Sequence, residues 1–275
     1  MSTTTGADGV TAIFGAGVMG ETLLSGLLRS GRPTEQIVIT EKRPDHAAML
    51  REKYGVRVLD NVAAAELADT LVLVVKPQDM EGLLAEIRDH IVPGNLVVSM
   101  AAGIPTSWLE QRLPARSSVV RVMPNTPALV DQGMAAISAG SNCTVEHLAE
   151  AEAMLASCGK VVQVPEKHQD AVTAISGSGP AYIFYVVEAM IEAGVLLGMP
   201  RATSTELVVQ TLYGAATMLR ETGEHPTVLR ERVSSPGGTT IAAIRQLDDN
   251  KVRAAFMTAM ESAAARSKEL ADGLG

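Results

Sequence analysis

A glycine-rich turn near the start of the chain constrains the fold more than any other segment. The apolar run at residues 10–14 leads without a spacer into residues 15–20, which read GAGVMG. Glycines at this spacing allow a tight turn after a strand, let a pyrophosphate approach the backbone, and let the next helix pack close to the strand. The helix N-terminus then presents unpaired N–H groups and a partial positive charge to an anion. The stretch therefore predicts a strand, turn and helix that bind a dinucleotide.

Apolar runs continue this pattern to about residue 164. Short β-branched runs alternate with longer helical segments, which is typical of a Rossmann-like, doubly wound and mostly parallel sheet. We expect strands at residues 37–40, 56–59, 70–75, 96–100, 119–123, 134–138 and 161–164, and helices at residues 23–28, 45–54, 80–87 and 106–113. Ligands of such sheets lie beyond the carboxyl ends of the strands, so these ends carry the candidate cofactor residues.

Three charged residues follow the second strand. Glu41 lies where an acid commonly binds the ribose 2′-hydroxyl of NAD(H). Lys42 and Arg43 come next and would suit the 2′-phosphate of NADP(H). The residues leave both interpretations open, together with a third in which these charges are simply solvated.

Other strand ends carry further candidates. Lys76 follows an apolar strand that Pro77 terminates, which places it either at the cofactor crevice or at the surface. Small residues at 99–103 would let a flat ring lie against the backbone, or would simply pack well. In the loop at residues 121–127, Asn125 and Thr126 either contact a ligand or hold the turn.

Strand patterns stop after residue 164, which predicts an NAD(P)-binding domain at residues 1–165 and an all-helical dimerisation and substrate domain at residues 166–275. We expect a helix at residues 167–175 that breaks at residues 176–179, followed by helices at 180–198, 202–220, 227–233, 240–247 and 251–270. Between residues 181 and 199 only Glu188 and Glu192 are neither apolar nor glycine. A helix that is apolar nearly all round must be buried. Because the last domain is small for that, a second copy of the chain is the expected cover.

The segment at residues 234–240 reads SSPGGTT and precedes a helix. Hydroxyls, glycines and a helix start together form an anion-binding turn. The alternative is a plain helix–helix connection with Thr240 as the N-cap, which explains the threonine but not the whole run.

Composition excludes several classes of function. The net charge of −8 and the pI near 5.2 argue against a nucleic-acid surface. The two cysteines and five histidines have no metal-ligand spacing, so no metal site is expected. Residues 1–9 lack the basic and apolar parts of a secretion signal, and the two glutamates of the apolar helix disfavour a membrane span. We expect a cytoplasmic protein without membrane or nucleic-acid partners.

Four motifs resemble one known family. The segments VVKPQ at 74–78, RVMPNTP at 121–127, SGSGPAY at 176–182 and VSSPGGTT at 233–240 occur in the same order in pyrroline-5-carboxylate reductases. With the glycine turn they span nearly the whole chain. The resemblance implies an oxidoreductase of proline biosynthesis that reduces 1-pyrroline-5-carboxylate to L-proline with NAD(P)H. It also implies a homodimer built on the helical domain, associated further into a decamer in many relatives.

The resemblance also implies roles for individual residues. Those expected at the cofactor are Phe14, Gly15, Ala16, Gly17, Val18, Met19, Gly20, Thr40, Lys42, Arg43, Asn61, Val74, Val75, Lys76, Pro77, Met100, Ala101 and Ala102. Those expected at the substrate are Glu166, Thr173, Ser235, Gly238, Thr239 and Thr240. We expect Thr173 to be the catalytic group, with its hydroxyl at the ring nitrogen. NADPH is the expected cofactor. NADH stays possible because this chain has an acid, Glu41, at a position where many relatives lack one.

Two other functions compete with this one. A β-hydroxyacid dehydrogenase would share the glycine turn but would carry a catalytic lysine shortly after a later glycine pair, whereas Gly179 is followed by PAYIFYVVEA. A non-catalytic NADP-binding regulator would need no substrate site, and the SSPGGTT segment argues against it. For the reductase we expect the substrate to lie in a cleft between the two domains.

Overall fold

The structure is a computed structural model that describes residues 9–272. Its chain divides into two units. The sheet unit contains the chain up to Ser178 together with the segment that begins at Ala263, and the helical unit is Gly179–Ser262. The sequence predicts a polar, frayed start at residues 1–9, of which residues 1–8 lie outside the described residues.

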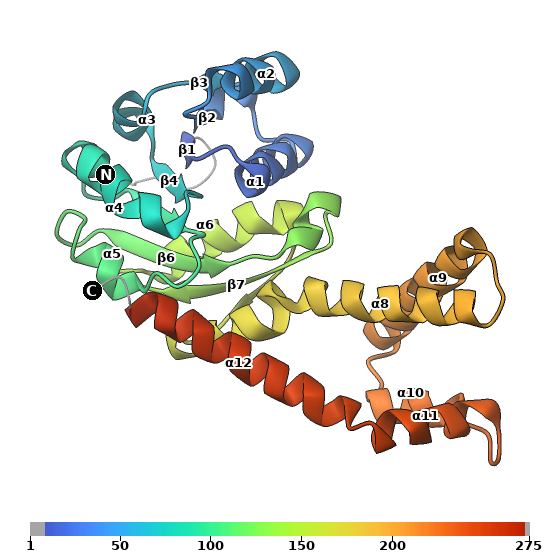
Figure 1. Cartoon of the computed structure of the whole chain (residues 1–275). Coiled ribbons are helices and arrows are strands. Elements are labelled where there is room, and N and C mark those ends of the chain that lie inside the picture. The colour runs from blue at the N-terminus through green and yellow to red at the C-terminus, as the bar shows by residue number, and fades with distance from the viewer. Residues whose placement is uncertain (1–8, 273–275) are drawn as a thin grey trace. The chain divides into compact units, whose positions relative to one another are not determined.

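A sheet of eight described strands forms the centre of the sheet unit, in the order β3-β2-β1-β4-β5-β6-β7-β8 (Figure 1). β6 and β7 pair antiparallel, and the other described neighbours pair parallel. The doubly wound, mostly parallel sheet expected from the sequence is therefore confirmed. The strands are β1 (Thr11–Phe14), β2 (Ile37–Thr40), β3 (Arg57–Val58), β4 (Thr70–Leu73), β5 (Leu96–Ser99), β6 (Ser118–Met123), β7 (Gly133–Ala139) and β8 (Gly159–Gln163).

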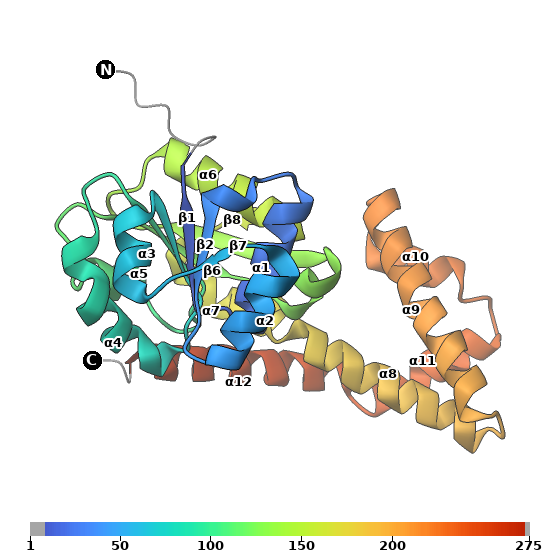
Figure 2. The same cartoon turned by 90° about the horizontal axis from the view of Figure 1, so that it is seen from above.

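Helices cover both faces of this sheet (Figures 1 and 2). Every residue of β1, β2, β4 and β5 is buried, as central parallel strands require. Successive side chains point to opposite faces, so Ile13 and Val72 join one core cluster while Phe14 and Leu73 join the other. The first cluster contains residues of α1 (Val18–Arg29), α2 (Pro44–Tyr54) and α6 (Val145–Leu155), and the second contains residues of α3 (Asn61–Leu67), α4 (Pro77–Ile87) and α5 (Thr106–Glu110).

Two of these helices, α3 and α6, are absent from the sequence expectation, although both begin with good N-caps. The Asp60 side chain accepts a hydrogen bond from the Ala63 backbone N–H at 2.7 Å. Thr144 and His147 form a reciprocal capping box at the start of α6. These caps satisfy backbone donors that a helix start otherwise leaves unpaired.

The chain stays helical from residue 166 into the helical unit, so the break predicted at residues 176–179 is wrong. A 3₁₀ turn at Glu166–His168 and α7 (Gln169–Val172) lead into a π-helical turn at Thr173–Gly177, and α8 (Gly179–Leu196) follows. In this turn the Ser178 N–H donates to the Thr173 carbonyl at 2.8 Å, which is a bond between residues five apart. Serine and glycine here widen the helix instead of ending it.

The helical unit consists of α8, α9 (Arg201–Thr222), α10 (Pro226–Arg232), α11 (Thr239–Asp249) and most of α12 (Val252–Asp272). The helices expected after residue 200 are confirmed to within two residues at either end. α8 and α9 pack closely at Gly194. A side chain there would overlap the Ser204 hydroxyl, which donates to the Ile191 carbonyl at 2.9 Å. Without a Cβ at Gly194, the two backbones can approach each other.

The apolar surface of α8 and α9 is exposed in the single chain. Tyr185 is 75% exposed and Leu196 88% exposed, and Phe184 and Tyr213 are also largely uncovered. By length and composition alone, the helical stretch Glu166–Leu196 would suffice to cross a membrane, and only 6% of its most apolar window is buried. This surface requires an apolar cover that the single chain does not provide.

The last turns of α12 belong to the sheet unit. The Ser267 hydroxyl, which is buried, donates to the Asp170 carboxylate of α7 at 2.7 Å. Gly103, which has φ +75°, lies where a Cβ would touch the Leu270 side chain. The C-terminal helix therefore holds the segment that leads into the π turn.

Candidate functional site

The glycine turn after β1 has a geometry that only glycine supports at two positions. Gly15 has φ +93°, and its N–H and that of Ala16 both donate to the Thr40 carbonyl at 3.2 Å. A Cβ at Gly15 would lie 3.2 Å from the Val74 carbonyl, and a Cβ at Gly20 would overlap the Gly15 carbonyl oxygen. The turn therefore binds β2 and β4 tightly and lets α1 pack on its own strand.

Gly17 differs from these two glycines, because its Cα faces open space. A Cβ there would meet no atom within 4 Å among the described residues. Gly17 is the N-cap of α1 and supplies no side-chain cap, so the first N–H groups of the helix have no acceptor within the helix. The glycine turn and the start of α1 therefore fit a dinucleotide pyrophosphate. Its oxygens would accept hydrogen bonds from these N–H groups and lie at the positive end of the helix dipole.

The remaining cofactor candidates come from neighbouring strands at the same edge of the sheet. Phe14 pairs with Thr40 on one side and with Leu73 on the other, and Leu73 pairs in turn with Ser99. The segments that follow these strands therefore end side by side. They contain the candidates Val74, Val75, Lys76, Pro77, Met100, Ala101 and Ala102.

Lys76 and Asn61 lie at helix starts beyond the strands. Lys76 is exposed and is the N-cap of α4. Asn61 is the first residue of α3, and its side-chain amide donates to the Glu86 carboxylate on α4 at 2.8 Å. Its amide N–H is thus used within the sheet unit, and its carbonyl oxygen remains an acceptor.

The charged residues after β2 divide into a buried acid and two exposed bases. The Glu41 side chain is 8% exposed, against 79% for Lys42 and 66% for Arg43. Glu41 accepts the Arg43 backbone N–H at 2.9 Å and its guanidinium at 3.2 Å, and lies 2.8 Å from Nδ1 of His46 on α2. Burial alone would raise the pKa of Glu41, but the bonds from Arg43 and His46 outweigh it and lower the pKa to about 2. The Glu41 carboxylate is thus occupied by hydrogen bonds within this segment, whereas the side chains of Lys42 and Arg43 are mostly exposed to solvent.

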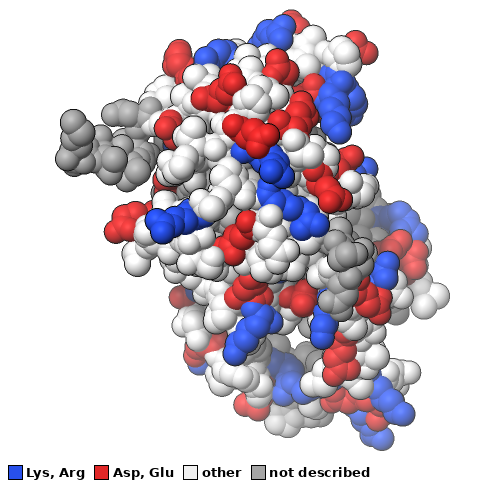
Figure 3. All heavy atoms as spheres, turned by 90° about the vertical axis from the view of Figure 1, so that its left-hand side faces the viewer, with Lys and Arg blue, Asp and Glu red and all other residues white. Residues whose placement is uncertain are grey.

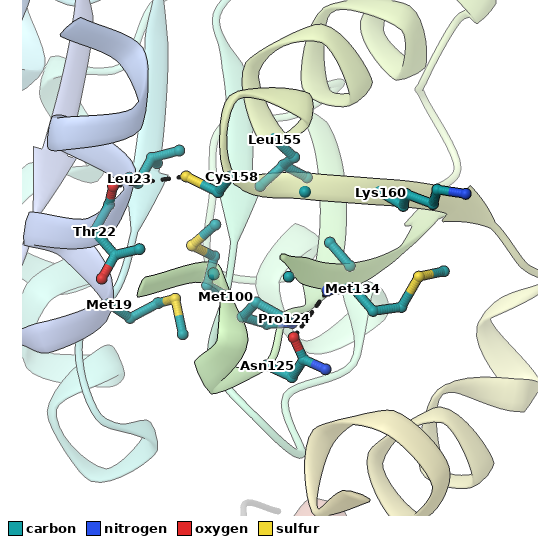
Figure 4. Close-up of a pocket in the computed structure, with 14 residues that line it drawn as sticks. Met19, Thr22, Leu23, Met100, Pro124, Asn125, Met134, Leu155, Cys158 and Lys160 are labelled. Carbon is teal, nitrogen blue, oxygen red and sulfur yellow. Dashed lines mark hydrogen bonds between the residues drawn. The ribbon is translucent and has the colours of Figure 1, made fainter. Parts of the chain in front are cut away.

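An apolar pocket lies beside α1, the helix that follows the glycine turn (Figure 4). Two cofactor candidates, Met19 and Met100, line it together with Pro124, Asn125 and residues of β7 and β8. The sequence analysis left Asn125 undecided, and it missed the pocket residues Leu23, Pro124, Met134, Leu155, Cys158 and Lys160. The proline-bounded loop that follows β6 is the signal that could have found Pro124.

Thr173 opens the π turn with its hydroxyl already oriented. Its Oγ1 donates to the Gln169 carbonyl at 2.9 Å, so the oxygen lone pairs are what a ligand would meet. Gln169 is fully buried, and its side-chain amide donates to Ser138 Oγ at 2.8 Å on β7. The Thr173 hydroxyl oxygen is therefore a hydrogen-bond acceptor whose position is fixed by the buried Gln169.

Glu166 bonds within the sheet unit. Its carboxylate accepts the Thr106 backbone N–H at 2.7 Å and the Thr106 hydroxyl at 2.6 Å, at the start of α5. The buried Arg121 of β6 donates to the same carboxylate at 3.3 Å. A carboxylate offers about four acceptor positions, so one remains for a further donor.

The SSPGGTT segment forms the N-terminus of α11 in the helical unit. Gly237 has φ +67°, and Gly238 is the N-cap, so the helix begins at Thr239 rather than at Thr240. A Cβ at Gly238 would overlap the Ser235 hydroxyl, and the Gly238 N–H donates to the Ser235 carbonyl at 3.0 Å. No side chain of the described residues caps the first N–H groups, which therefore suit an anion.

Charge on the molecular surface is mixed. Over the described residues on the face in Figure 3, Lys and Arg lie among Asp and Glu. Such an arrangement does not provide the continuous basic surface that nucleic-acid phosphates favour.

Comparison with known proteins agrees with this site. The family model of NADP oxidoreductase, coenzyme F420-dependent, matches residues 10–103, and that of pyrroline-5-carboxylate reductase dimerisation matches residues 166–270. The pyrroline-5-carboxylate reductase of Corynebacterium melassecola is 46% identical over 263 residues, which cover 94% of this chain and 97% of the relative. The chain belongs to the pyrroline-5-carboxylate reductase family.

Solved structures of the family extend the match to three dimensions. The pyrroline-5-carboxylate reductase of Coxiella burnetii aligns with a TM-score of 0.91 at 36% identity, covering 95% of this chain and 98% of that one. The enzyme of Plasmodium falciparum, solved with NADP bound, aligns with a TM-score of 0.87 at 28% identity, covering 97% and 99%. Family membership thus makes the chain an NADP-binding oxidoreductase that forms homo-oligomers, and it removes the β-hydroxyacid dehydrogenase alternative.

Proposed function

We propose that this chain reduces 1-pyrroline-5-carboxylate to L-proline, with NADPH as the preferred hydride donor and Thr173 at the reacting nitrogen. The observation that carries this assignment is the orientation of the Thr173 hydroxyl. Because its proton goes to the Gln169 carbonyl, the oxygen can only accept from a ligand. A protonated cyclic imine offers the matching N–H donor.

The reaction needs placement more than proton transfer. Bound NADPH supplies the hydride that goes to the carbon of the C=N bond. The imine nitrogen arrives protonated, so the new amine forms without a histidine or lysine acid. Thr173 fixes the nitrogen relative to the bound cofactor.

The substrate carboxylate is assigned to the start of α11. The N–H groups of Thr239 and Thr240, with the Ser235 hydroxyl, supply donors at the positive end of the helix dipole, while the Gly238 N–H is held by the Ser235 carbonyl. Glu166 has one acceptor position left beyond its bonds to Thr106 and Arg121, which suits a substrate N–H.

The cofactor preference is assigned to the loop after β2. With Glu41 bonded to Arg43 and His46, its carboxylate is not free for the ribose. The exposed Lys42 lies 3.9 Å from Asp79, and Arg43 keeps guanidinium N–H groups beyond those bonded to Glu41, so both can still donate to a 2′-phosphate. A charge-assisted bond of this kind is worth roughly 1.5–3 kcal/mol. We therefore assign NADPH as the preferred cofactor and NADH as the weaker one.

The assembly is assigned to the helical unit. The exposed faces of α8 and α9 supply the apolar area for a homodimer. We assign this dimer as the building block of a decamer, as the resemblance to the family implies. Such a dimer would cover the apolar surface of α8, and we assign the enzyme to the cytoplasm on this ground.

One assay tests this proposal. Purified protein is mixed with 1-pyrroline-5-carboxylate and either NADPH or NADH, and cofactor oxidation and L-proline formation are both followed. We expect stoichiometric proline and a kcat/KM at least tenfold higher with NADPH. Tight NADPH binding without proline formation would instead identify a non-catalytic regulator, and a preference for NADH would show that Glu41 turns to the ribose.

A further inference from the structure

Asn125, in the loop between β6 and the 3₁₀ turn Thr126–Val130, uses both ends of its side chain. Its Oδ1 accepts the Met134 backbone N–H at 2.8 Å, a bond drawn in Figure 4. Its Nδ2 donates to the Ser176 carbonyl at 3.1 Å. Asn125 therefore ties the start of β7 to the π turn.

The Ser176 carbonyl has a particular need for this donor. In a regular α-helix it would accept the N–H of residue 180, but residue 180 is a proline and has no N–H. The side chain of Asn125 supplies the missing donor. Without it, a carbonyl in a partly buried turn would lose a hydrogen bond.

A second contact holds the same turn. A Cβ at Gly177 would overlap the end of the Met123 side chain, so the turn lies directly against the last residue of β6. On the other side, Gln169 anchors the preceding helical turn to Ala136 and Ser138 of β7. The π turn is thus held before and after Thr173 by the antiparallel pair of strands β6 and β7.

We propose that Asn125 is a positioning residue that fixes the π turn and, through it, the direction of the Thr173 lone pairs. The amide touches neither reacting atom in this assignment. It acts by keeping the wide turn at Thr173–Gly177, since a return to regular α-helical spacing would rotate Thr173 relative to the pocket. This inference rests on the proposed role of Thr173.

Asn125→Asp separates the two bonds of the side chain. Aspartate keeps an acceptor for Met134 but cannot donate to Ser176, and Asn125→Ala gives the uncharged comparison. Asn95 is a matched control, because its Oδ1 accepts the Val92 N–H at 2.7 Å and its Nδ2 donates to the Ala68 carbonyl at 2.8 Å. Asn95 precedes β5, at the end of the sheet opposite the glycine turn.

The first measurement is hydrogen–deuterium exchange of the full-length protein, read at residues 173–181. We expect both Asn125 variants to increase deuterium uptake of this segment several-fold, whereas Asn95→Asp leaves it as in the wild type. Equal uptake in wild type and both Asn125 variants would overturn the inference, whatever the rates are.

The second measurement is a kinetic double-mutant cycle. We expect Asn125→Asp to lower kcat/KM for the imino acid about tenfold with the Kd of NADPH within twofold, and to have little further effect in a Thr173→Val background. Additive losses would show that Asn125 does not act through Thr173. If Thr173→Val retains full activity, the proposed role of Thr173 fails, and the exchange result still decides whether Asn125 holds the turn.

Discussion

The glycine turn and the helical unit differ in how far a single chain completes them. Around the turn, neighbouring backbones fill the space so closely that Gly15 and Gly20 admit no side chain. On α8 and α9, by contrast, large apolar side chains such as Tyr185 and Leu196 face solvent. The shape of the first region is set by contacts within one chain, whereas the apolar side chains of the second need a further subunit to cover them. A substitution in the turn should therefore act through the fold of one chain, and a substitution on α8 through the assembly.

The largest effect is expected from Val187→Asp on α8. A charge placed in an apolar subunit interface without a partner costs several kcal/mol, so the dimer should be lost and the chain should aggregate or unfold. Sedimentation velocity and proline formation measure this. Val145→Asp, the same change at a 78% exposed residue of α6, is the control and should leave the assembly intact. A stable, active monomer of Val187→Asp would break the comparison.

Gly20→Ala tests the self-contained region. The new methyl group overlaps the Gly15 carbonyl oxygen, so the turn must shift, at a cost of about 3 kcal/mol in stability. Urea denaturation and NADPH titration should both show the loss. Gly17→Ala sharpens the result, since its methyl group meets no described atom and should weaken NADPH binding with little change in stability. Equal stabilities for the two variants would contradict the steric account of the turn.

Thr173→Val should act on the reaction alone. The variant keeps the shape of the side chain but loses the oxygen that accepts the imine N–H. We expect turnover to fall about tenfold, equivalent to roughly 1.4 kcal/mol of transition-state stabilisation, with the Kd of NADPH nearly unchanged. Thr173→Ser restores the oxygen and should recover most of the rate. Wild-type turnover in Thr173→Val would leave orientation of the substrate to the SSPGGTT segment.

The smallest effect is a pH dependence at Glu41. Its pKa is lowered to about 2 in the folded protein, from an ordinary value of 4.5. The folded state therefore gains stability from the ionised carboxylate above pH 4.5, and loses that gain as the pH falls toward 2. Glu41→Gln should be less stable at neutral pH, and its Tm should fall less between pH 4.5 and 2. Parallel Tm profiles for the two proteins would show that the bonds to Arg43 and His46 do not form in solution.

The sequence predicted the parts of this molecule that depend on local pattern. The strands and the glycine turn follow from apolar periodicity and from positions where glycine alone fits. The π turn was missed because the run SGSG is typical of a break, and only the donor from Asn125, far away in sequence, shows why the helix continues. The bonds of Glu166 to Thr106 and Arg121 were likewise beyond reach, since they join residues 60 and 45 positions apart.

The bond between Ser267 and Asp170 has a consequence for biosynthesis. The two residues are 97 positions apart, and the whole helical unit lies between them in the chain. On the ribosome, the strands and the glycine turn can form early, but the segment that leads to Thr173 obtains its last fastening only when α12 has emerged. A nascent chain can thus become competent for dinucleotide binding well before it becomes competent for catalysis.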